Sequence, residues 1–237
     1  MSEYELLPDV FVSVTPAGAY HAAVGGAYLR AVGGADLGAV GGAAGGSVGA
    51  GDDPAHRLLV GILGEPRTPE PAPERLAAWT GLTDPEAALA LLHRVQSVGW
   101  VRAETVARDA PSARIEQDIP GLLRQLSTEQ RALLADATGF QLASSGFAHE
   151  SAEGIAALAA DLAMVHARHQ GLLHGNLRLH RGGIATVDAA GNSQLGLWPL
   201  AIGTHAFLLV VAGAPLFNHA AFADMVWGLT RRYAASA

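Results

Sequence analysis

The chain has 237 residues, of which 50% are hydrophobic and 16% are charged, so it has enough apolar material for packed cores. A length of this kind allows one large domain or two modest ones, and we expect two. The formal charge of −7 argues against a basic face that neutralises phosphates, and all 15 basic residues are arginine. The absence of cysteine excludes disulfides, a thiolate nucleophile and cysteine-ligated zinc or iron–sulfur clusters.

The amino-terminal residues, MSEYELLPDV, lack the basic start and the long apolar core of a secretory signal. No stretch of the sequence reaches the ~18 consecutive uncharged apolar residues that a membrane-spanning helix needs. We therefore expect a soluble, cytoplasmic protein with no membrane partner.

The first elements are predicted to form a small β-hairpin. Residues 9–14, DVFVSV, alternate as a strand, residues 15–18, TPAG, have turn chemistry, and residues 19–24 are a second apolar piece. An octad repeat of AVGGA units then makes residues 23–51 an Ala/Gly-rich insert. Eight residues of alanine and glycine cannot bury a face of their own, so the insert is predicted to be a loop.

A membrane-seeking glycine-zipper helix is the alternative interpretation of this insert. Arg30 and Asp36 would then lie near the centre of the span, where each costs a few kcal/mol. This cost favours the loop.

Three helices and a strand are predicted after the insert. Pro54, Pro73 and Pro85 each stand where proline is tolerated at a helix start, and Gly81 closes the second helix. Residues 99–102, GWVR, follow as a strand. This order resembles a winged-helix domain covering residues 1–108, with the opening hairpin and the later strand as its sheet.

A DNA-binding winged helix would use basic side chains on or after its third helix. Here those candidates are His93, Arg94 and Arg102, and the helix begins with Asp84 and Glu86. The acidic start argues against nucleic acid as a partner and favours a structural or protein-binding role.

Residues 109–118 are polar and are predicted to be a linker to a second domain, residues 119–237. A glycine at position 139 suits a hairpin turn, and the continuous apolar run 206–212 is predicted to be the central strand. The full prediction is a helix (121–130), two strands (132–135 and 140–145), a long helix capped by Ser151, a bulged strand (177–187), a strand interrupted or left at an edge near Pro199 (194–200), the central strand, and a final helix capped by Asn218.

The long helix has two apolar faces. Bulky residues at Ile155, Leu158, Leu162 and Val165 form one stripe, which we expect to pack on the helix's own sheet. The second face is expected to meet a helix of another subunit, unless its alanines only reflect helix propensity. That second face consists of Ala152, Ala156, Ala160, Ala163 and Ala167.

The segments LLADATGFQLASSG, SAEGIAALAADLAMVHAR, VDAAGNSQLGLWPL, AFLLVVAG and FADMVWGLTRRY together resemble the dynein light chain roadblock family. The resemblance implies an α+β fold in which a roadblock-type α/β domain with a five-stranded antiparallel sheet flanked by helices follows the winged-helix-like domain. It also implies dimerisation through an edge strand and the long helix, and in bacteria a partnership with small Ras-like GTPases. The interface would comprise the five alanines above with Leu177, Leu179 and Ile184.

Candidate chemistry is sparse. His166, His169 and His174 lie close in sequence, but without cysteine or an HExxH motif they are interpreted as solvated histidines rather than as a metal site. Ser144 and Ser145 near His149 lack a G-x-S-x-G turn. We therefore expect no catalytic residue, metal or cofactor. The sequence favours a non-enzymatic bacterial scaffold that homodimerises and binds a protein partner, with a dimeric winged-helix transcription regulator as the alternative.

Overall fold

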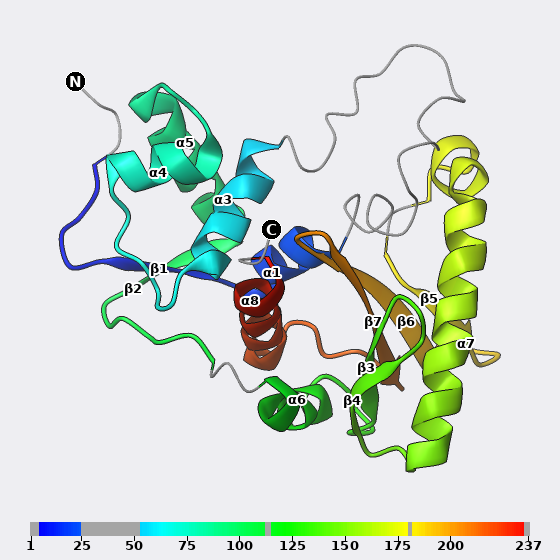
Figure 1. Cartoon of the computed structure of the whole chain (residues 1–237). Helices are drawn as coiled ribbons and strands as arrows, with labels where there is room; N and C mark the ends of the chain where they lie inside the picture. Colours follow the sequence, from blue (N-terminus) through cyan, green and yellow to red (C-terminus); the bar gives the residue numbers. More distant parts are fainter. Residues whose placement is uncertain (1–4, 25–52, 112–114, 180–181, 235–237) are drawn as a thin grey trace.

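The computed structural model describes residues 5–24, 53–111, 115–179 and 182–234 (Figure 1). Residues 25–52, which make up most of the Ala/Gly-rich insert, lie outside the described residues. The prediction that the insert is a loop therefore stays a prediction. The fold is α+β, with a two-stranded sheet β1-β2 and a five-stranded antiparallel sheet of order β4-β3-β7-β6-β5.

The elements follow one another along the chain with these bounds: β1 Phe11–Val14, α1 Pro16–Ala23, α3 Pro54–Gly64, α4 Pro73–Thr80, α5 Pro85–Ser97, β2 Val101–Glu104, α6 Ile115–Arg124, β3 Ala132–Asp136, β4 Gln141–Ser145, α7 His149–Arg168, the π-helix η1 Gly171–Asn176, β5 Ile184–Val187, β6 Ser193–Ile202, β7 His205–Ala212 and α8 Ala220–Tyr233.

The five-stranded sheet confirms several predictions. Strands β3 and β4 form the predicted hairpin, in which Gly139 has a φ of 89° and the amide of Asp136 donates to the carbonyl of Phe140 over 3.0 Å. Strand β7 is the central strand of the five. Pro199 does not interrupt β6, but it lies beyond Leu197, the last β6 residue that β5 pairs, so its missing N–H faces no strand.

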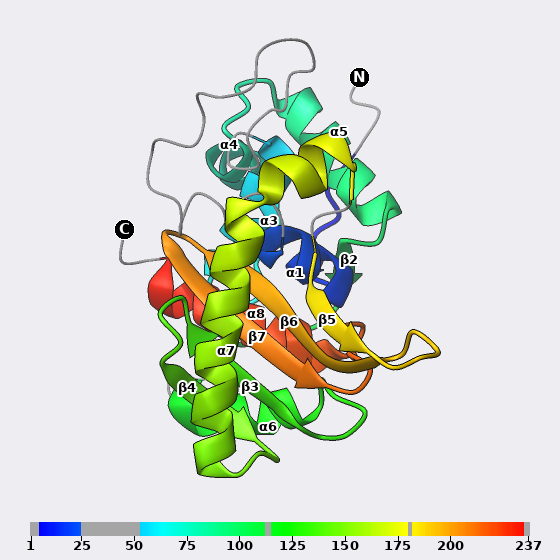
Figure 2. The same cartoon turned by 90° about the vertical axis from the view of Figure 1, so that its right-hand side faces the viewer.

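Helices cover both faces of this sheet. Successive side chains of β3 point to opposite faces of the sheet. Leu133 packs in a cluster with the alanines of α7, and Leu134 packs in a cluster with Phe222 of α8. Both leucines are fully buried. Figures 1 and 2 show α7 crossing one face, while α6, α8 and the amino-terminal helices lie on the other.

The orientation predicted for α7 is wrong. Its alanines, Ala152, Ala156, Ala160 and Ala163, are buried against the helix's own sheet, whereas Leu158, Leu162 and Val165 are exposed. The sheet supplies bulky side chains at this contact, among them Leu133, Leu208 and Val210. Small residues on α7 let the helix approach them closely, which is how large and small side chains interdigitate in a dense core. The helix also begins at His149 after Ala148, so Ser151 lies inside it and is not its cap.

The predicted opening hairpin is also wrong, because residues 16–23 form helix α1. Thr15 accepts a hydrogen bond from the amide of Gly18 over 3.2 Å and Pro16 is the first helical residue. Threonine followed by proline suits a helix N-terminus as well as it suits a turn. Strand β1 pairs with β2 instead, with Val12 opposite Ala103.

Gly18 marks the point where α1 meets the turn between α5 and β2, because a Cβ at this position would overlap the carbonyl oxygen of Trp100. Gly18→Ala is therefore expected to lower the free energy of unfolding by about 1–3 kcal/mol. Gly154→Ala is the matched control, since nothing lies within 4 Å of a Cβ at that position on α7. Alanine there should stabilise the helix by about 0.5–1 kcal/mol. Chemical denaturation of both variants measures the difference, and equal stabilities would contradict the close approach.

The three helices after the insert confirm the sequence prediction. Asp53 and Asp84 cap α3 and α5 by accepting from the amides of Ala55 and Glu86 over 3.0 and 3.1 Å, and Gly81 ends α4 with a φ of 69°. After β2 the chain turns back, and the amide of Thr68 donates to the carbonyl of Arg108 over 2.8 Å. The winged-helix resemblance of residues 1–108 stays a prediction.

The two halves of the chain share one hydrophobic core. Tyr20 of α1 lies 6.0 Å from Phe217 and 6.2 Å from Phe222, measured between ring centroids. The indole N–H of Trp227 donates to the carbonyl of Glu65 over 2.9 Å, and Arg108 stacks over the same indole. The boundary between residues 1–108 and 119–237 stays a prediction, and α6 already begins at Ile115, inside the predicted linker.

Candidate interaction surface

The bulky stripe of α7 is an apolar surface without a partner in the described chain. Leu158, Leu162 and Val165 are spaced four and three residues apart and are between 38% and 49% exposed. Full burial of a leucine or valine side chain stabilises a structure by about 1.5–3 kcal/mol, so leaving a row of them in water is costly. Contiguous exposed apolar patches commonly mark protein-binding sites.

Within the part of the chain that the structure describes, the sheet also has an unpaired edge strand. Strand β5 is the last strand of the sheet, and Ala185, Thr186 and Val187 are exposed. Ile155 of α7 and Ile184 of β5 both pack partly buried against the cluster between α7 and the sheet. At about 100° per residue the exposed stripe continues from the Ile155 flank of the helix, and Ile184 of β5 packs against the same cluster as Ile155. Unpaired edge strands are ready templates for another strand.

The structure separates the residues predicted for the interface. Ala152, Ala156, Ala160 and Ala163 are buried inside the protein, and Ala167 is half-buried. Leu177 and Leu179 are exposed, but they precede β5 and are not part of a strand, because η1 extends to Asn176. Ile184 is the member that lies at the edge strand.

Leu158, Leu162 and Val165 are the residues that sequence reasoning assigned to the wrong side. The stripe itself was visible in the sequence. The signal that decides its direction is the presence of bulky residues at Leu133 and Leu208, which leave room only for alanine on the inner face of α7.

The candidate DNA contacts do not form one basic face. His93 lies in a groove of about 300 Å³ beside Leu89 and Gln96, Arg94 is exposed on α5, and Arg102 forms an ion pair with Glu104 at 2.6 Å. Partnered with a carboxylate, Arg102 offers little free charge to a phosphate.

Two histidines near the end of α7 contact each other. The rings of His166 and His174 meet edge to face at 5.2 Å, and burial, together with electrostatic repulsion from nearby His174, lowers the pKa of His166. Among the residues that the structure describes, no group of three or more His, Asp or Glu side chains is placed to hold a metal ion.

The serine pair also lacks a catalytic arrangement. The hydroxyl of Ser144 accepts a hydrogen bond from the side-chain Nε2 of Gln141 over 3.0 Å, and His149 lies 3.5 Å from Glu153 one turn along the same helix. These contacts occupy each group separately and do not join a serine to a histidine.

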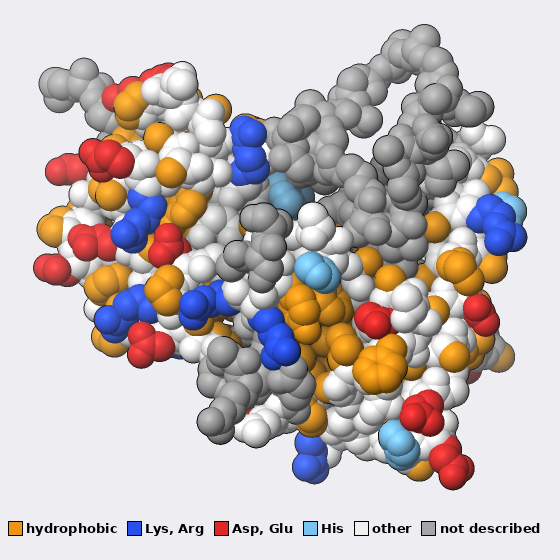
Figure 3. Space-filling view, in the orientation of Figure 1, with side chains coloured by type: hydrophobic (Ala, Val, Ile, Leu, Met, Phe, Trp, Pro, Cys, Tyr) orange, Lys and Arg blue, Asp and Glu red, His pale blue; other side chains and the backbone are white. Residues whose placement is uncertain are grey.

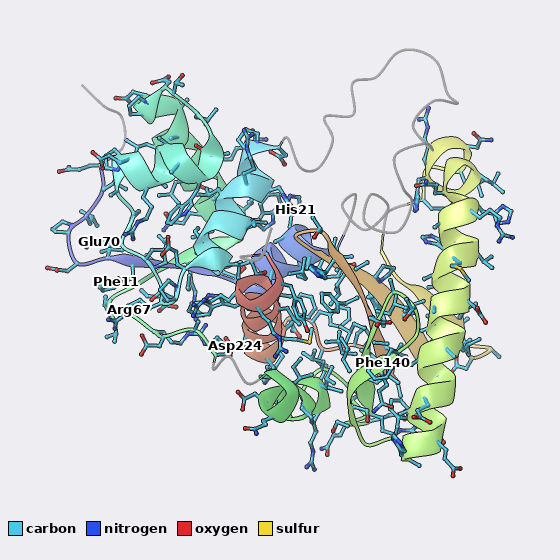
Figure 4. The ribbon with its side chains drawn as sticks, viewed as in Figure 1. Phe11, His21, Arg67, Glu70, Phe140 and Asp224 are labelled. Carbon is cyan, nitrogen blue, oxygen red and sulfur yellow. The ribbon has the colours of Figure 1, made fainter. Side chains whose placement is uncertain are left out.

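A second titratable cluster lies where α1 meets α3. His21, which is labelled in Figure 4, stacks on Trp100 with ring centroids 3.9 Å apart. His56 contacts the carbonyl of Ala22 at 3.0 Å. Burial lowers the pKa of His21, the carboxylate of Asp53 opposes this shift, and His56 adds to it. The folded protein therefore holds His21 neutral at a pH where the unfolded chain would protonate it.

This difference predicts a pH-dependent stability. Below the ordinary histidine pKa of 6.5 the unfolded chain binds a proton that folded His21 resists, so stability should fall as the pH falls through that value. His21→Phe keeps the stacking and should flatten the slope. Thermal unfolding from about pH 7.5 to about pH 5.5 measures it, with His169→Gln, an exposed histidine, as the control. Parallel slopes for the wild type and His21→Phe would contradict the assignment.

Among the described residues, no helix has both the length and the apolar character needed to cross a membrane. No protein-family model and no curated protein matches the chain. Two solved structures are similar in part. The gliding protein MglB from Thermus thermophilus is 22% identical, with a TM-score of 0.36, over 54% of this chain and 94% of that one. A structure described as MglB with a tetrameric arrangement is 23% identical, with a TM-score of 0.35, over 52% of this chain and 89% of that one. At these identities and TM-scores, function has to be argued from the chain's own geometry.

Proposed function

We propose that the protein is a non-enzymatic homodimeric scaffold that presents a helical surface to a protein partner. The observations that carry the proposal are the exposed apolar stripe of α7 and the edge position of β5 among the described strands. A second copy related by a two-fold axis would place each edge strand against the other and each stripe against the other. Self-complementary surfaces of this kind are what a closed two-fold dimer requires.

The two parts of this surface would make different contributions. Strand pairing at β5 would satisfy backbone groups that now face water, and a short edge strand alone is a weak contact. The apolar stripe would supply the larger part of the free energy, because Leu158, Leu162 and Val165 would leave water together. The dimer would then be a continuous sheet covered on one face by paired α7 helices.

We propose further that the partner is a small Ras-like GTPase, which this protein regulates. The order of the five strands, with α7 on one face and α6 and α8 on the other, supports the roadblock resemblance from which this partner is inferred. The outer side of α8 is packed against α1 and α3, so the partner would be met at the α7 layer or at the ends of the sheet. No observation on the described residues favours the alternative of a DNA-binding regulator.

Sedimentation of the full chain tests the dimer. A chain of 24.3 kDa should sediment with twice that mass at micromolar concentration. The proposed GTPase partner is tested by immobilising the full chain and identifying the proteins that it retains from cell extracts supplemented with GTP or with GDP. Retention of one Ras-like protein in a single nucleotide state is the expected result, and a strictly monomeric chain would remove the proposed mechanism.

A further inference from the structure

The end of α7 carries a second exposed apolar surface, which differs in charge from the rest of the molecule. We define it as the α7 tip, made of Arg168, Leu172, Leu177, Arg178 and Leu179. Figures 1 and 2 show the end of α7 and η1 extending past the end of the sheet. The tip is thus a protrusion rather than part of the layer that covers the sheet.

The chain around the tip is cationic. Residues 162–187 contain three arginines and no aspartate or glutamate, in a chain whose formal charge is −7. In Figure 3, arginine and histidine side chains gather with hydrophobic ones at this end of α7. A local reversal of charge against the net charge of the molecule points to an anionic counterpart.

The tip is an ordered structure and not a loose loop. The amides of Leu177 and Leu179 donate to the carbonyls of Leu172 and Leu173, each over 2.9 Å, and His174 contacts the carbonyl of Leu179 at 3.0 Å. These bonds fold residues 177–179 back onto η1. Arg178 has a φ of 53°, a left-handed conformation that is uncommon for arginine.

The leucines of this ordered tip nevertheless face water. Leu172, Leu177 and Leu179 are 51%, 57% and 53% exposed. Because the turn holds these three leucines in water, the isolated chain loses the free energy that burying them would provide. That free energy would be gained if the three side chains entered an apolar environment outside the chain.

We propose that the α7 tip docks on the anionic surface of a phospholipid bilayer. Leu172, Leu177 and Leu179 enter the boundary between headgroups and acyl chains, and Arg168 and Arg178 pair with lipid phosphates. Apolar side chains combined with basic ones are the features that hold peripheral segments at an anionic interface. Arginine suits this role because its planar guanidinium pairs with phosphate through two hydrogen bonds.

The shape of the tip favours lipid over an acidic protein. Protein partners usually receive apolar anchors in shaped pockets, whereas a bilayer accepts a convex group of leucines without a matching surface. The contact is peripheral and independent of the proposed dimer, which uses Leu158, Leu162 and Val165 and the β5 edge. It also goes beyond the sequence, from which no membrane partner was expected.

Co-sedimentation of the full chain with vesicles tests the proposal. The vesicles contain equal parts phosphatidylglycerol and phosphatidylcholine, or phosphatidylcholine alone. We expect binding to the anionic vesicles at low salt, weakened by high salt, and little binding to the neutral ones. Equal binding to both would overturn the proposal, and so would binding to neither, which would leave an acidic protein as the counterpart.

Two double variants separate the charged and the apolar contributions. Arg168→Glu with Arg178→Asn, which tolerates the left-handed backbone, should weaken vesicle binding by about tenfold or more. Leu172→Ser with Leu177→Ser should do the same while the chain stays folded, because these side chains are exposed. The matched controls are Arg94→Glu and Leu7→Ser, which change exposed residues that are distant in sequence from the α7 tip.

The controls decide between the tip and a general surface effect. Loss of binding in Arg94→Glu or Leu7→Ser as large as in the tip variants would count against the tip. Sedimentation of every variant in the absence of lipid reports the dimer separately. A monomeric wild type that still binds anionic vesicles would reject the proposed dimer and retain the tip, and the reverse result would do the opposite.

Discussion

Leu158→Asp with Leu162→Asp is expected to convert the proposed dimer into a folded monomer. Both side chains are exposed on α7, so aspartate costs the isolated subunit little. In the dimer the same carboxylates would be buried opposite each other, and apolar residues near the centre of an interface commonly account for most of its affinity. We expect the dimer dissociation constant to rise by about a hundredfold or more. Sedimentation over a range of concentrations gives the constant.

A matched substitution elsewhere makes this result specific. Val106→Asp changes a valine that is 76% exposed and lies outside α7, and it should leave the dimer intact. The melting temperature of the double variant reports whether its subunit is still folded. If the double variant stays dimeric, association does not use the stripe, and if it unfolds, the stripe is part of the core.

Ala156→Leu, in contrast to the two aspartate substitutions, should lower the stability of the subunit itself. Ala156 is fully buried between α7 and the sheet, and its carbonyl lies 3.2 Å from the place of a Cβ on Gly139. Three added heavy atoms at this contact must push the helix away from the sheet. Overpacking of this kind costs about 1–3 kcal/mol, and occasionally more. Calorimetry should show the melting temperature falling by about 2–4 °C for each kcal/mol.

Ala157→Leu is the control for this prediction, because Ala157 is the next residue on the same helix and is exposed. It should unfold near the wild-type temperature. Should Ala156→Leu be neutral while Leu162→Ser destabilises the subunit, α7 would face the sheet with its bulky stripe, as hydrophobicity alone suggests.

The contrast between these two predictions shows where sequence reasoning stops. A period of 3.6 residues identifies two apolar faces on α7, but it holds no information about which face meets the sheet. The choice depends on residues distant in sequence, above all Leu133 of β3 and Leu208 of β7, whose size demands small partners. Hydrophobicity alone favours the bulky face, and close packing selects the other one.

Local ambiguity explains the error at the amino terminus. Thr15 and Pro16 can open a helix or form a turn, and the tertiary contact of Gly18 with Trp100 favours the helix. Where capping, glycine and apolar pattern agree, as at Asp53, Gly81 and Asp84, the predicted helices α3, α4 and α5 are confirmed. At the final helix, His219 serves as the cap in place of the expected Asn218, one residue later.

The burial of α8 has a consequence for the size of any assembly. This helix packs on the sheet through Phe222 and Val226, while Trp227 and Arg108 join it to the amino-terminal half. The layer that could otherwise stack on another copy is therefore already occupied within the same chain. The proposed association through α7 would then close after two subunits instead of continuing from both faces into larger stacks. The amino-terminal half of each copy would thus block further association on the α8 side of the sheet.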